Sequence, residues 1–316
     1  MQTTTRDRAA GVLLASACGD ALGAGYEFGP ALPPDAPVGM IGGGLGPFAP
    51  GEWTDDTSMS LCVARAGLRH GLLTEAGLDE VARGFLDWFG SNPPDIGVQT
   101  RRILGATASP SARDLMKAAA AYYAAHPDSS AGNGALMRTA PVALAHPGDP
   151  QAIAEAARLV NDLTHADPVS AEACILWSVA IDHAVQHATF DGLRIGLGLL
   201  APDRAAHWSA LLDEAETLPA RAFAKNGWVV HALQAAWAAI SQTPVPDQAP
   251  HDHLRLSLEN AVRAGGDTDT VACIAGGLLG ARWGATAVPP SWRQKLHGWP
   301  GLTGDGLVGL LNGMQG

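Results

Sequence analysis

Two short acidic stretches, far apart in the chain, hold the residues best suited to chemistry. The first is Glu52-Trp53-Thr54-Asp55-Asp56-Thr57, and the second is Gly265-Gly266-Asp267-Thr268-Asp269-Thr270. Each gathers carboxylates and hydroxyls within a few residues and continues into an apolar segment with helical spacing. Hard divalent cations prefer oxygen ligands of this kind. We therefore expect the two stretches to close one site that holds more than one metal ion.

The spacing of these acids favours helix N-termini. Side chains of adjacent helical residues point about 100° apart, so Asp55 and Asp56 converge more easily where one of them is still in loop conformation. Asp267, Asp269 and Thr270 fit one opening helical turn in the same way. Asp and Thr are also common helix caps, so capping is the alternative interpretation of each stretch taken alone. The repetition of the pattern favours a metal site.

Composition indicates a globular protein and excludes several classes of function. The 316 residues are 47% hydrophobic and 16% charged, with a net charge of −11. Because no basic run or stripe is present, we expect no non-specific nucleic-acid binding through charge. The four cysteines are Cys18, Cys62, Cys174 and Cys273, and none belongs to a Cys-x-x-Cys pair. They indicate buried free thiols in a reducing compartment rather than disulfides or a zinc site.

The N-terminal segment superficially resembles an export signal. Arg6 and Arg8 precede an apolar run that ends at Cys18, but the run is short and Asp7 interrupts the basic region. We expect no export. No stretch approaches the roughly 18 apolar residues that we require for a membrane span. We therefore expect a cytoplasmic protein without membrane contacts, and a monomer.

Helical periodicity dominates the chain. It predicts helices over residues 6–22, 57–70, 73–89, 112–125, 150–163, 169–187, 227–240, 254–263 and 270–283, with one or two short helices in the tail to Gly316. Almost no segment shows the alternation of a strand. Residues 29–53 are rich in Pro and Gly, which predicts a long functional loop. We expect one all-α domain over residues 1–316, with the acidic stretches meeting near its middle.

Further candidate site residues lie in loops between these helices. Glu27 sits in a Gly-rich context, where a surface loop acid is the alternative. Asp95 follows two prolines and is either a helix cap or a third carboxylate of the site. The Gly132-Asn133-Gly134 turn leads into a helical segment, where free N–H groups cradle anions, although such a turn is often only a turn.

Arginine and histidine side chains at three places in the chain are the last candidate site residues. Arg138 follows the glycine turn and faces either ligand or solvent. His165 lies in a loop, where a structural role is the alternative to a functional one. His251 and His253 flank Asp252, and after a Pro-rich connection we expect a solvated helix start rather than a metal site.

Over nearly its whole length the chain resembles the ADP-ribosylglycohydrolases. The matching motifs, in the family's order, are Gly19-Asp20-Ala21-Leu22-Gly23 with Glu27, Pro50-Gly51-Glu52-Trp53-Thr54-Asp55-Asp56-Thr57-Ser58-Met59, Asp95-Ile96-Gly97, Gly132-Asn133-Gly134 with Met137-Arg138, Thr164-His165, and Gly265-Gly266-Asp267-Thr268-Asp269-Thr270. The resemblance implies an orthogonally packed, multi-helix all-α fold with a central cleft that holds two Mg²⁺ or Mn²⁺ ions. One departure is Pro94, which precedes Asp95 where many relatives carry an aromatic residue.

The resemblance also implies roles for individual residues. The implied metal ligands are Thr54, Asp55, Asp56, Asp267, Asp269 and Thr270. The implied catalytic acids are Asp56, Asp95, Glu27 and Asp269. The implied ADP-ribose contacts are Gly132, Asn133, Gly134, Met137, Arg138 and His165.

The implied activity is hydrolysis of the N- or O-glycosidic bond between ADP-ribose and an acceptor. Asp95 favours arginine as the acceptor, on an ADP-ribosylated protein or conjugate. Serine-linked or small-molecule conjugates, and a protein that binds ADP-ribose without cleaving it, are the alternatives. A dinuclear phosphoesterase would carry His-rich ligand sets, which the chain lacks.

Overall fold

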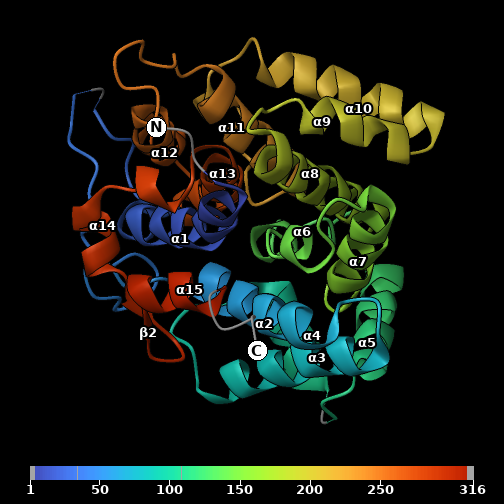
Figure 1. Cartoon of the computed structure of the whole chain (residues 1–316). Helices are drawn as coiled ribbons and strands as arrows, with labels where there is room; N and C mark the ends of the chain where they lie inside the picture. The colour runs from blue at the N-terminus through green and yellow to red at the C-terminus, as the bar shows by residue number, and fades with distance from the viewer. Residues whose placement is uncertain (1–3, 34, 108, 312–316) are drawn as a thin grey trace.

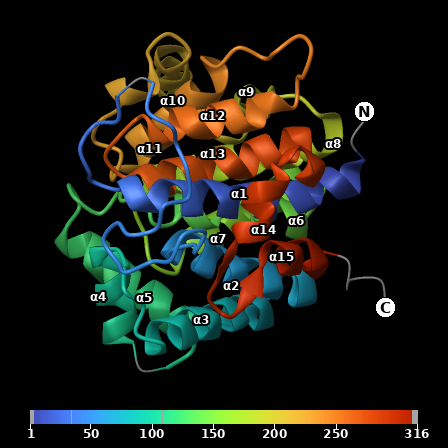
Figure 2. The same cartoon turned by 90° about the vertical axis from the view of Figure 1, so that its left-hand side faces the viewer.

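Two glycine-rich helices form the centre of the molecule. The computed structural model describes residues 4–33, 35–107 and 109–311. Within them, α1 (Thr5–Gly23) runs antiparallel to α13 (Thr268–Trp283) (Figures 1 and 2). A Cβ atom at Gly19 would lie 2.0 Å from the carbonyl oxygen of Ala272, and one at Gly280 would lie 2.0 Å from that of Gly11. Glycine therefore lets the two backbones touch.

The remaining helices surround this pair on several sides. One side, below α1 in Figures 1 and 2, holds α2 (Asp55–His70), α3 (Glu75–Gly90), α4 (Val98–Ala106) and α5 (Ala112–Ala125). The opposite side holds α9 (Gly192–Gly196), α10 (Pro202–Ala215), α11 (Val229–Ser241) and α12 (Asp252–Val262). Between them lie α6 (Val142–Ala145), α7 (Pro150–Asp162) and α8 (Pro168–His187).

The C-terminal part adds two short helices and a small hairpin. These are α14 (Pro290–Lys295), β1 (His297–Gly298), β2 (Leu302–Thr303) and α15 (Gly304–Leu310). Five 3-10 turns complete the described chain: η1 (Ala24–Tyr26), η2 (Leu136–Arg138), η3 (Leu197–Leu199), η4 (Ala220–Ala222) and η5 (Ala285–Ala287). The hairpin strands pair antiparallel, with His297 opposite Thr303. The part of the tail prediction that covers residues 312–316 lies outside the described residues.

The all-α prediction is confirmed. The predicted helices appear within a few residues of their expected bounds, and α5 has the bounds that its periodicity predicted. The prediction assigned no helix to residues 190–226, where α9, η3, α10 and η4 lie, and it missed the hairpin. Residues 29–53 form the predicted long loop, without a helix in the described part. The extent of a single domain over residues 1–316 stays a prediction.

The apolar residues of every layer join in one buried cluster. It includes large side chains such as Trp88, Trp177 and Trp208. All four cysteines are free and buried, as predicted. Contrary to the expectation about membrane spans, Thr5–Tyr26 is long and apolar enough to cross a membrane. However, 83% of its apolar window is buried inside the structure, as in a core helix.

Candidate functional site

The N-terminus of α2 is held by an acid from α1. One carboxylate oxygen of Asp20 accepts hydrogen bonds from the backbone N–H and the hydroxyl of Thr54, both at 2.9 Å. The other accepts from the backbone N–H of Thr57 at 3.0 Å and from its hydroxyl at 2.6 Å. Asp20 is fully buried. These four bonds fix the position from which Asp55 and Asp56 project.

The N-terminus of α13 is held by two amides instead. The backbone N–H of Asp267 donates to Oδ1 of Asn226 at 3.0 Å, and Nδ2 of Asn226 donates to the carbonyl of Gly265 at 2.8 Å. Nδ2 of Asn133 donates to Oδ2 of Asp267 at 2.7 Å. Gly266 has a φ of 70°, and a Cβ there would lie 2.4 Å from Oδ1 of Asn226. Glycine is therefore required for this loop.

These contacts bear on the capping interpretation of the two acidic stretches. Thr54 and Asp267 occupy the N-cap positions of α2 and α13, but neither side chain caps its own helix. Both Asp55 and Asp56 lie in the first turn of α2, so neither remains in the loop as we had expected. In the first turn of α13, Oδ1 of Asp269 accepts from the backbone N–H of Thr270 at 2.9 Å, while its Oδ2 lies 3.5 Å from the hydroxyl of Thr54 in the other stretch.

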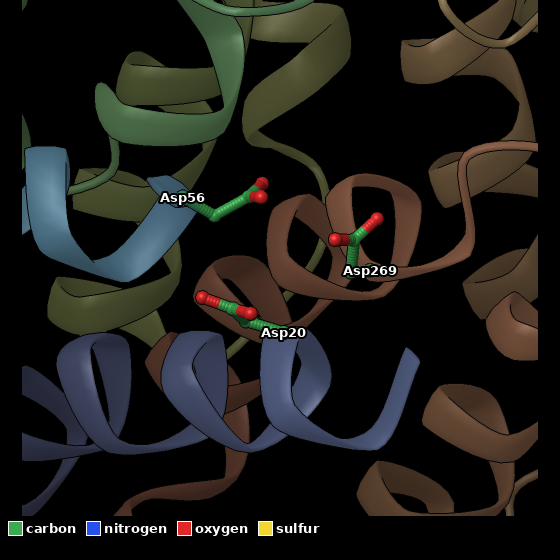
Figure 3. Close-up of side chains that lie close together, drawn as sticks. All are labelled: Asp20, Asp56 and Asp269. Carbon is green, nitrogen blue, oxygen red and sulfur yellow. The ribbon is translucent and has the colours of Figure 1, made fainter. Parts of the chain in front are cut away.

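The structure brings the acids of both stretches together. Asp20, Asp56 and Asp269, from α1, α2 and α13, each place a carboxylate oxygen within 4.8 Å of the others (Figure 3). Glu27, Asp95 and Asp269 form a second group of the same size. The hydroxyls of Thr54 and Thr270 lie 3.2 and 3.4 Å from Oδ2 of Asp56.

Burial and mutual repulsion disfavour the charged form of every acid in this group. Burial, followed by repulsion from the neighbouring acids, raises the pKa of Asp55 to about 8 and that of Glu27 to about 9. The same causes raise the pKa of Asp56 and Asp269 well above their ordinary range. Burial raises the pKa of Asp20 to about 6, against the effect of its four donors, and raises that of Asp95 and Asp267.

The residues present fit a group of divalent cations. Oδ1 of Asp56 is buried and has no hydrogen-bond partner among the described residues. No Lys or Arg is found among the described residues that line the adjoining cavity. Such a concentration of carboxylates requires protons or cations to offset its charge, and oxygen ligands in this number suit hard divalent ions.

We call the adjoining space the acidic cavity. Its volume is about 390 Å³. It is lined by carboxylates on one side and by predicted substrate contacts on the other: Glu27, Asp55, Asp95, Asp267, Asp269, Thr270, Gly132, Asn133, Gly134, Met137 and His165. Most of the predicted site residues therefore surround one space, from six different parts of the chain, whereas Thr54, Asp56 and Arg138 do not line it. Asp95 does not cap α4, whose N-cap is Gly97, so the cap interpretation of Asp95 is excluded.

His165 faces the cavity in its neutral form. Burial, with a smaller effect of Arg138, lowers its pKa to about 3. Arg138 donates to Oγ1 of Thr164 at 2.6 Å, and this hydroxyl lies 2.7 Å from Nδ1 of His165. If the hydroxyl of Thr164 donates to Nδ1, the ring proton of His165 sits on Nε2. Nε2 faces the backbone at Gly132 and Gly134.

Arg138 itself is not a cavity residue, contrary to its prediction as an ADP-ribose contact. Its side chain is completely buried, stacks 4.6 Å from the ring centre of Phe85, and donates to the carbonyl of Val160 at 3.2 Å. It bears on the site through Thr164 and through its charge, which contributes to the lowered pKa of His165. The solvated helix start predicted for residues 251–253 is also wrong in part. His253 is buried against Trp283, whose Nε1 donates to it at 3.1 Å.

Sequence reasoning missed the role of Asp20. The residue stood within a matched motif but received no function. Its signal was an acid amid the apolar residues of a helix, with small residues on both sides. An acid buried in this way must have partners, but the sequence does not say which.

Comparisons with known proteins agree with this geometry. The family model described as ADP-ribosylglycohydrolase matches residues 1–314. The ADP-ribosyl-[dinitrogen reductase] glycohydrolase of Rhodospirillum rubrum is 30% identical, over 93% of this chain and 91% of its own. The ADP-ribosylarginine hydrolase Tri1 of Pseudomonas putida (strain GB-1) is also 30% identical, over 92% of this chain and 74% of its own.

A human protein and a solved structure are also similar to this chain. The ADP-ribosylhydrolase ARH3 of Homo sapiens is 27% identical over 78% of this chain and 75% of its own. A solved structure, titled an ADP-ribosylglycohydrolase-related protein complex, superposes with a TM-score of 0.71 at 28% identity, covering 98% of this chain and 97% of the other. The protein is thus an enzyme, a glycosidic-bond hydrolase, and it belongs to the ADP-ribosylglycohydrolase family.

Proposed function

We propose that the enzyme releases ADP-ribose from ADP-ribosylated arginine, and that it does so with two bound divalent cations, Mg²⁺ or Mn²⁺. The observation that carries the proposal is the acidic cavity, in which a set of oxygen ligands faces a glycine turn and a neutral histidine. The relatives from Rhodospirillum and Pseudomonas have names that specify ADP-ribosyl and ADP-ribosylarginine substrates. Their likeness supports arginine as the acceptor here.

The cations would be held by the ends of α2 and α13. Thr54, Asp55 and Asp56 would supply ligands from α2, and Asp267, Asp269 and Thr270 would supply them from α13. Bound there, divalent cations would supply Lewis acidity toward the ribose hydroxyls and the attacking water. The buried Oδ1 of Asp56, which has no partner in the described residues, is the oxygen that most needs such a ligand.

The other side of the cavity suits the pyrophosphate. Gly132 and Gly134 bring the backbone close to the cavity, and a Cβ at Gly134 would lie 3.1 Å from the ring of His165. The neutral imidazole of His165 places Nε2 beside these glycines, where its Nε2–H tautomer would donate to an anionic oxygen. A further cavity of about 640 Å³ shares Gly132 and Gly227 with the acidic cavity and is lined by Lys225 and the exposed Trp228. It offers room and an aromatic face for the adenosine.

The reaction would consume one water molecule. Water attacks C1″ of the ribose, the bond from C1″ to the acceptor nitrogen breaks, and the departing nitrogen takes a proton. With cations bound to offset the charge of the cluster, Asp95 and Glu27, the half-buried carboxylates of the cavity, would be ionised and placed to accept the proton of the water. The transition state carries oxocarbenium character, as in other glycoside cleavage, and the surrounding carboxylates favour a positive charge at C1″.

Release of free ADP-ribose from two matched peptides tests the proposal. One peptide carries ADP-ribose on arginine and the other carries it on serine. We expect release from the arginine-linked peptide in the presence of Mg²⁺ or Mn²⁺. Release from the serine-linked peptide alone would overturn the choice of acceptor. Tight binding of ADP-ribose with release from neither peptide would show a non-catalytic binding protein.

A further inference from the structure

A second, smaller cavity adjoins the site on the far side of two of its carboxylates. Its volume is about 140 Å³, and three tryptophans, Trp53, Trp88 and Trp299, line it. We call it the tryptophan pocket. Asp55 and Asp95 line both this pocket and the acidic cavity. The two carboxylates therefore form the partition between the two spaces.

This position relates the pocket to the bond that is cleaved. Of these two spaces, Asn133 and His165 line only the acidic cavity and the tryptophans line only the pocket, although Trp299 also lines a third cavity. If ADP-ribose occupies the acidic cavity, as in the proposed function on which this inference rests, its C1″ lies toward the metal-binding acids. The pocket then lies on the side of the departing group. Its rim includes the exposed residues Ser91, Asn92 and Pro94, so a side chain attached to another protein can enter.

The lining of the pocket selects for a planar cation. It contains the carboxylates of Glu52, Asp55 and Asp95, and no Lys, Arg or His among the described residues. One oxygen of Glu52 accepts a hydrogen bond from the backbone N–H of Ala49 at 2.8 Å, which leaves the other available. Indole faces attract guanidinium groups through cation–π contacts, and carboxylates bind them with paired hydrogen bonds. A volume of about 140 Å³ has room for a guanidinium and part of its stem, but not for a nucleoside.

The pocket is built rigidly onto the helix that carries the metal-binding acids. Nε1 of Trp53 donates to the carbonyl of Trp299 at 3.0 Å. The backbone N–H of Trp53 donates to the carbonyl of His297 at 3.1 Å, which ties the β1–β2 hairpin to the segment before α2. A Cβ at Gly298 would lie 2.5 Å from Nε1 of Trp53, so the hairpin can approach only because this residue is glycine. The hairpin thus holds one wall of the tryptophan pocket in place, in addition to packing against the segment before α2.

We propose that the tryptophan pocket is the acceptor subsite, which binds the guanidinium of the arginine that leaves. Trp299 and Trp88 would cover its faces, and Glu52, Asp55 and Asp95 would accept its N–H groups. The pocket would then account for selectivity toward a cationic acceptor over a neutral hydroxyl acceptor. It contributes no group to the hydrolysis of C1″ other than the two partition carboxylates.

Three variants at two positions test the subsite without disturbing the backbone contacts. Trp299→Ala removes the indole and leaves the carbonyl that accepts from Trp53, and Trp299→Phe restores an aromatic face. Glu52→Gln removes a charge. Trp292→Ala and Asp247→Asn are matched controls, because Trp292 is half-buried, Asp247 is exposed, and neither lines the pocket. Thermal melts followed by circular dichroism confirm that each variant is folded.

The probes are ethylguanidinium, its neutral isostere ethylurea, and ADP-ribose, each measured by calorimetry in the presence of Mn²⁺ and as an inhibitor of release. We expect wild-type protein to bind ethylguanidinium more tightly than ethylurea. Both effects are expected in Trp299→Ala and in Glu52→Gln: weaker binding of ethylguanidinium and a higher KM for the arginine-linked peptide. We expect each change to be about tenfold, which is the order of a cation–π contact that is shielded from water. Trp299→Phe should retain most of the affinity, and ADP-ribose binding should not change.

Three results would overturn the subsite. One is equal binding of ethylguanidinium and ethylurea by wild-type protein. Another is unchanged ethylguanidinium affinity and KM in both variants. The third is that the variants bind ADP-ribose more weakly to the same extent as ethylguanidinium, which would show that Trp299 and Glu52 have a general structural role. Failure of the proposed function is a separate outcome, since wild-type protein would then release nothing from the arginine-linked peptide, while calorimetry with ethylguanidinium would still test the pocket.

Discussion

The N-termini of α2 and α13 carry similar acidic turns but are held in place by different chemistry. The α2 turn is bound by a buried carboxylate, Asp20, which accepts four hydrogen bonds from Thr54 and Thr57. The α13 turn is bound by the neutral amides of Asn226 and Asn133. Hydrogen bonds to an ionised group are roughly twice as strong as neutral ones. The α2 end is therefore the more firmly held while Asp20 is charged.

The two helix ends differ in the charge that their partners add to the site. Asp20 adds a further negative charge to a cluster that already repels itself, and burial raises its pKa to about 6. Its charge is stabilised by its four donors and, in the proposed enzyme, by cations nearby. The amides on α13 add no charge. The attachment of the α2 end thus depends on the charge state of the site. The α13 end is held by neutral groups, and we call these amides the neutral frame of α13.

The largest expected effect follows from removing an acid that both helix ends face. Asp56→Ala or Asp269→Ala should reduce ADP-ribose release by more than roughly 100-fold, beyond the usual loss for a residue that only supports a ligand. The fold should survive, because each change also removes repulsion from a buried acidic cluster. Kinetic assays and circular dichroism melts check both parts. Full activity in either variant would contradict the metal-site assignment.

The second effect tests the charged clamp on α2. Asp20→Asn keeps the size of the side chain but replaces one acceptor oxygen with a donor, opposite groups that themselves donate. We expect roughly a 10- to 100-fold loss of activity and of Mn²⁺ affinity, as for other residues that orient metal ligands. Asp182→Asn is the control, since Asp182 is also buried and accepts from a backbone N–H, that of Gly148 at 2.9 Å, but on α8.

A metal-binding role for Asp20 would give a different result from a clamp. If Asp20 were itself a ligand, the variant should lose one equivalent of Mn²⁺ in a stoichiometric titration. If it is a clamp, both equivalents should remain, each bound more weakly. Unchanged activity and affinity would contradict both interpretations.

A smaller effect is expected at the neutral frame of α13. Asn226→Ala removes the acceptor for the N–H of Asp267 and the donor to Gly265. Because these are neutral hydrogen bonds, we expect a loss of activity of about tenfold, below that of Asp20→Asn. Steady-state kinetics of the two variants side by side provide the comparison. A larger loss for Asn226→Ala would reverse the proposed ranking of the two helix ends.

The pH dependence of stability tests how strongly the acids of the site are held in their protonated form. The folded-state pKa values of Asp55 and Glu27 are raised to about 8 and about 9 from ordinary values of 3.8 and 4.5. Between these limits the folded state keeps protons that the unfolded state has lost, so stability falls as pH rises. We expect the Tm in EDTA to decrease from pH 5 to pH 8, and the gain in Tm from Mn²⁺ to increase over the same window. A Tm in EDTA that rises over this range would contradict the raised pKa values.

The sequence predicted the parts of the site that depend on local pattern. Carboxylates at the start of apolar helical segments identified Asp55, Asp56, Asp267 and Asp269, and helical periodicity located most helices. The remaining features depend on contacts between distant segments. Asp20 finds its partners 34 and 37 residues away, and Arg138 is buried because Phe85 of α3 and Thr164 of the loop after α7 contact it. Periodicity identifies an element but not its neighbours.

The hairpin shows the same limit at the other end of the chain. Strands β1 and β2 contain two residues each, which is too short for an alternating pattern to be detected. Trp299 belongs to the turn between them, and it reaches the site only because His297 pairs with the segment before α2. The family resemblance supplied the roles of site residues, but it gave no indication of the tryptophan pocket.

The most direct test of the central claim is the metal dependence of ADP-ribose release. The protein would be stripped with EDTA, its metal content measured by mass spectrometry, and Mn²⁺ or Mg²⁺ then added in steps while release from the arginine-linked peptide is followed. We predict no release from the stripped protein, and recovery in parallel with occupancy as two ions bind. Full release from protein shown to contain no metal would contradict the account that the ends of α2 and α13 form a divalent-cation site.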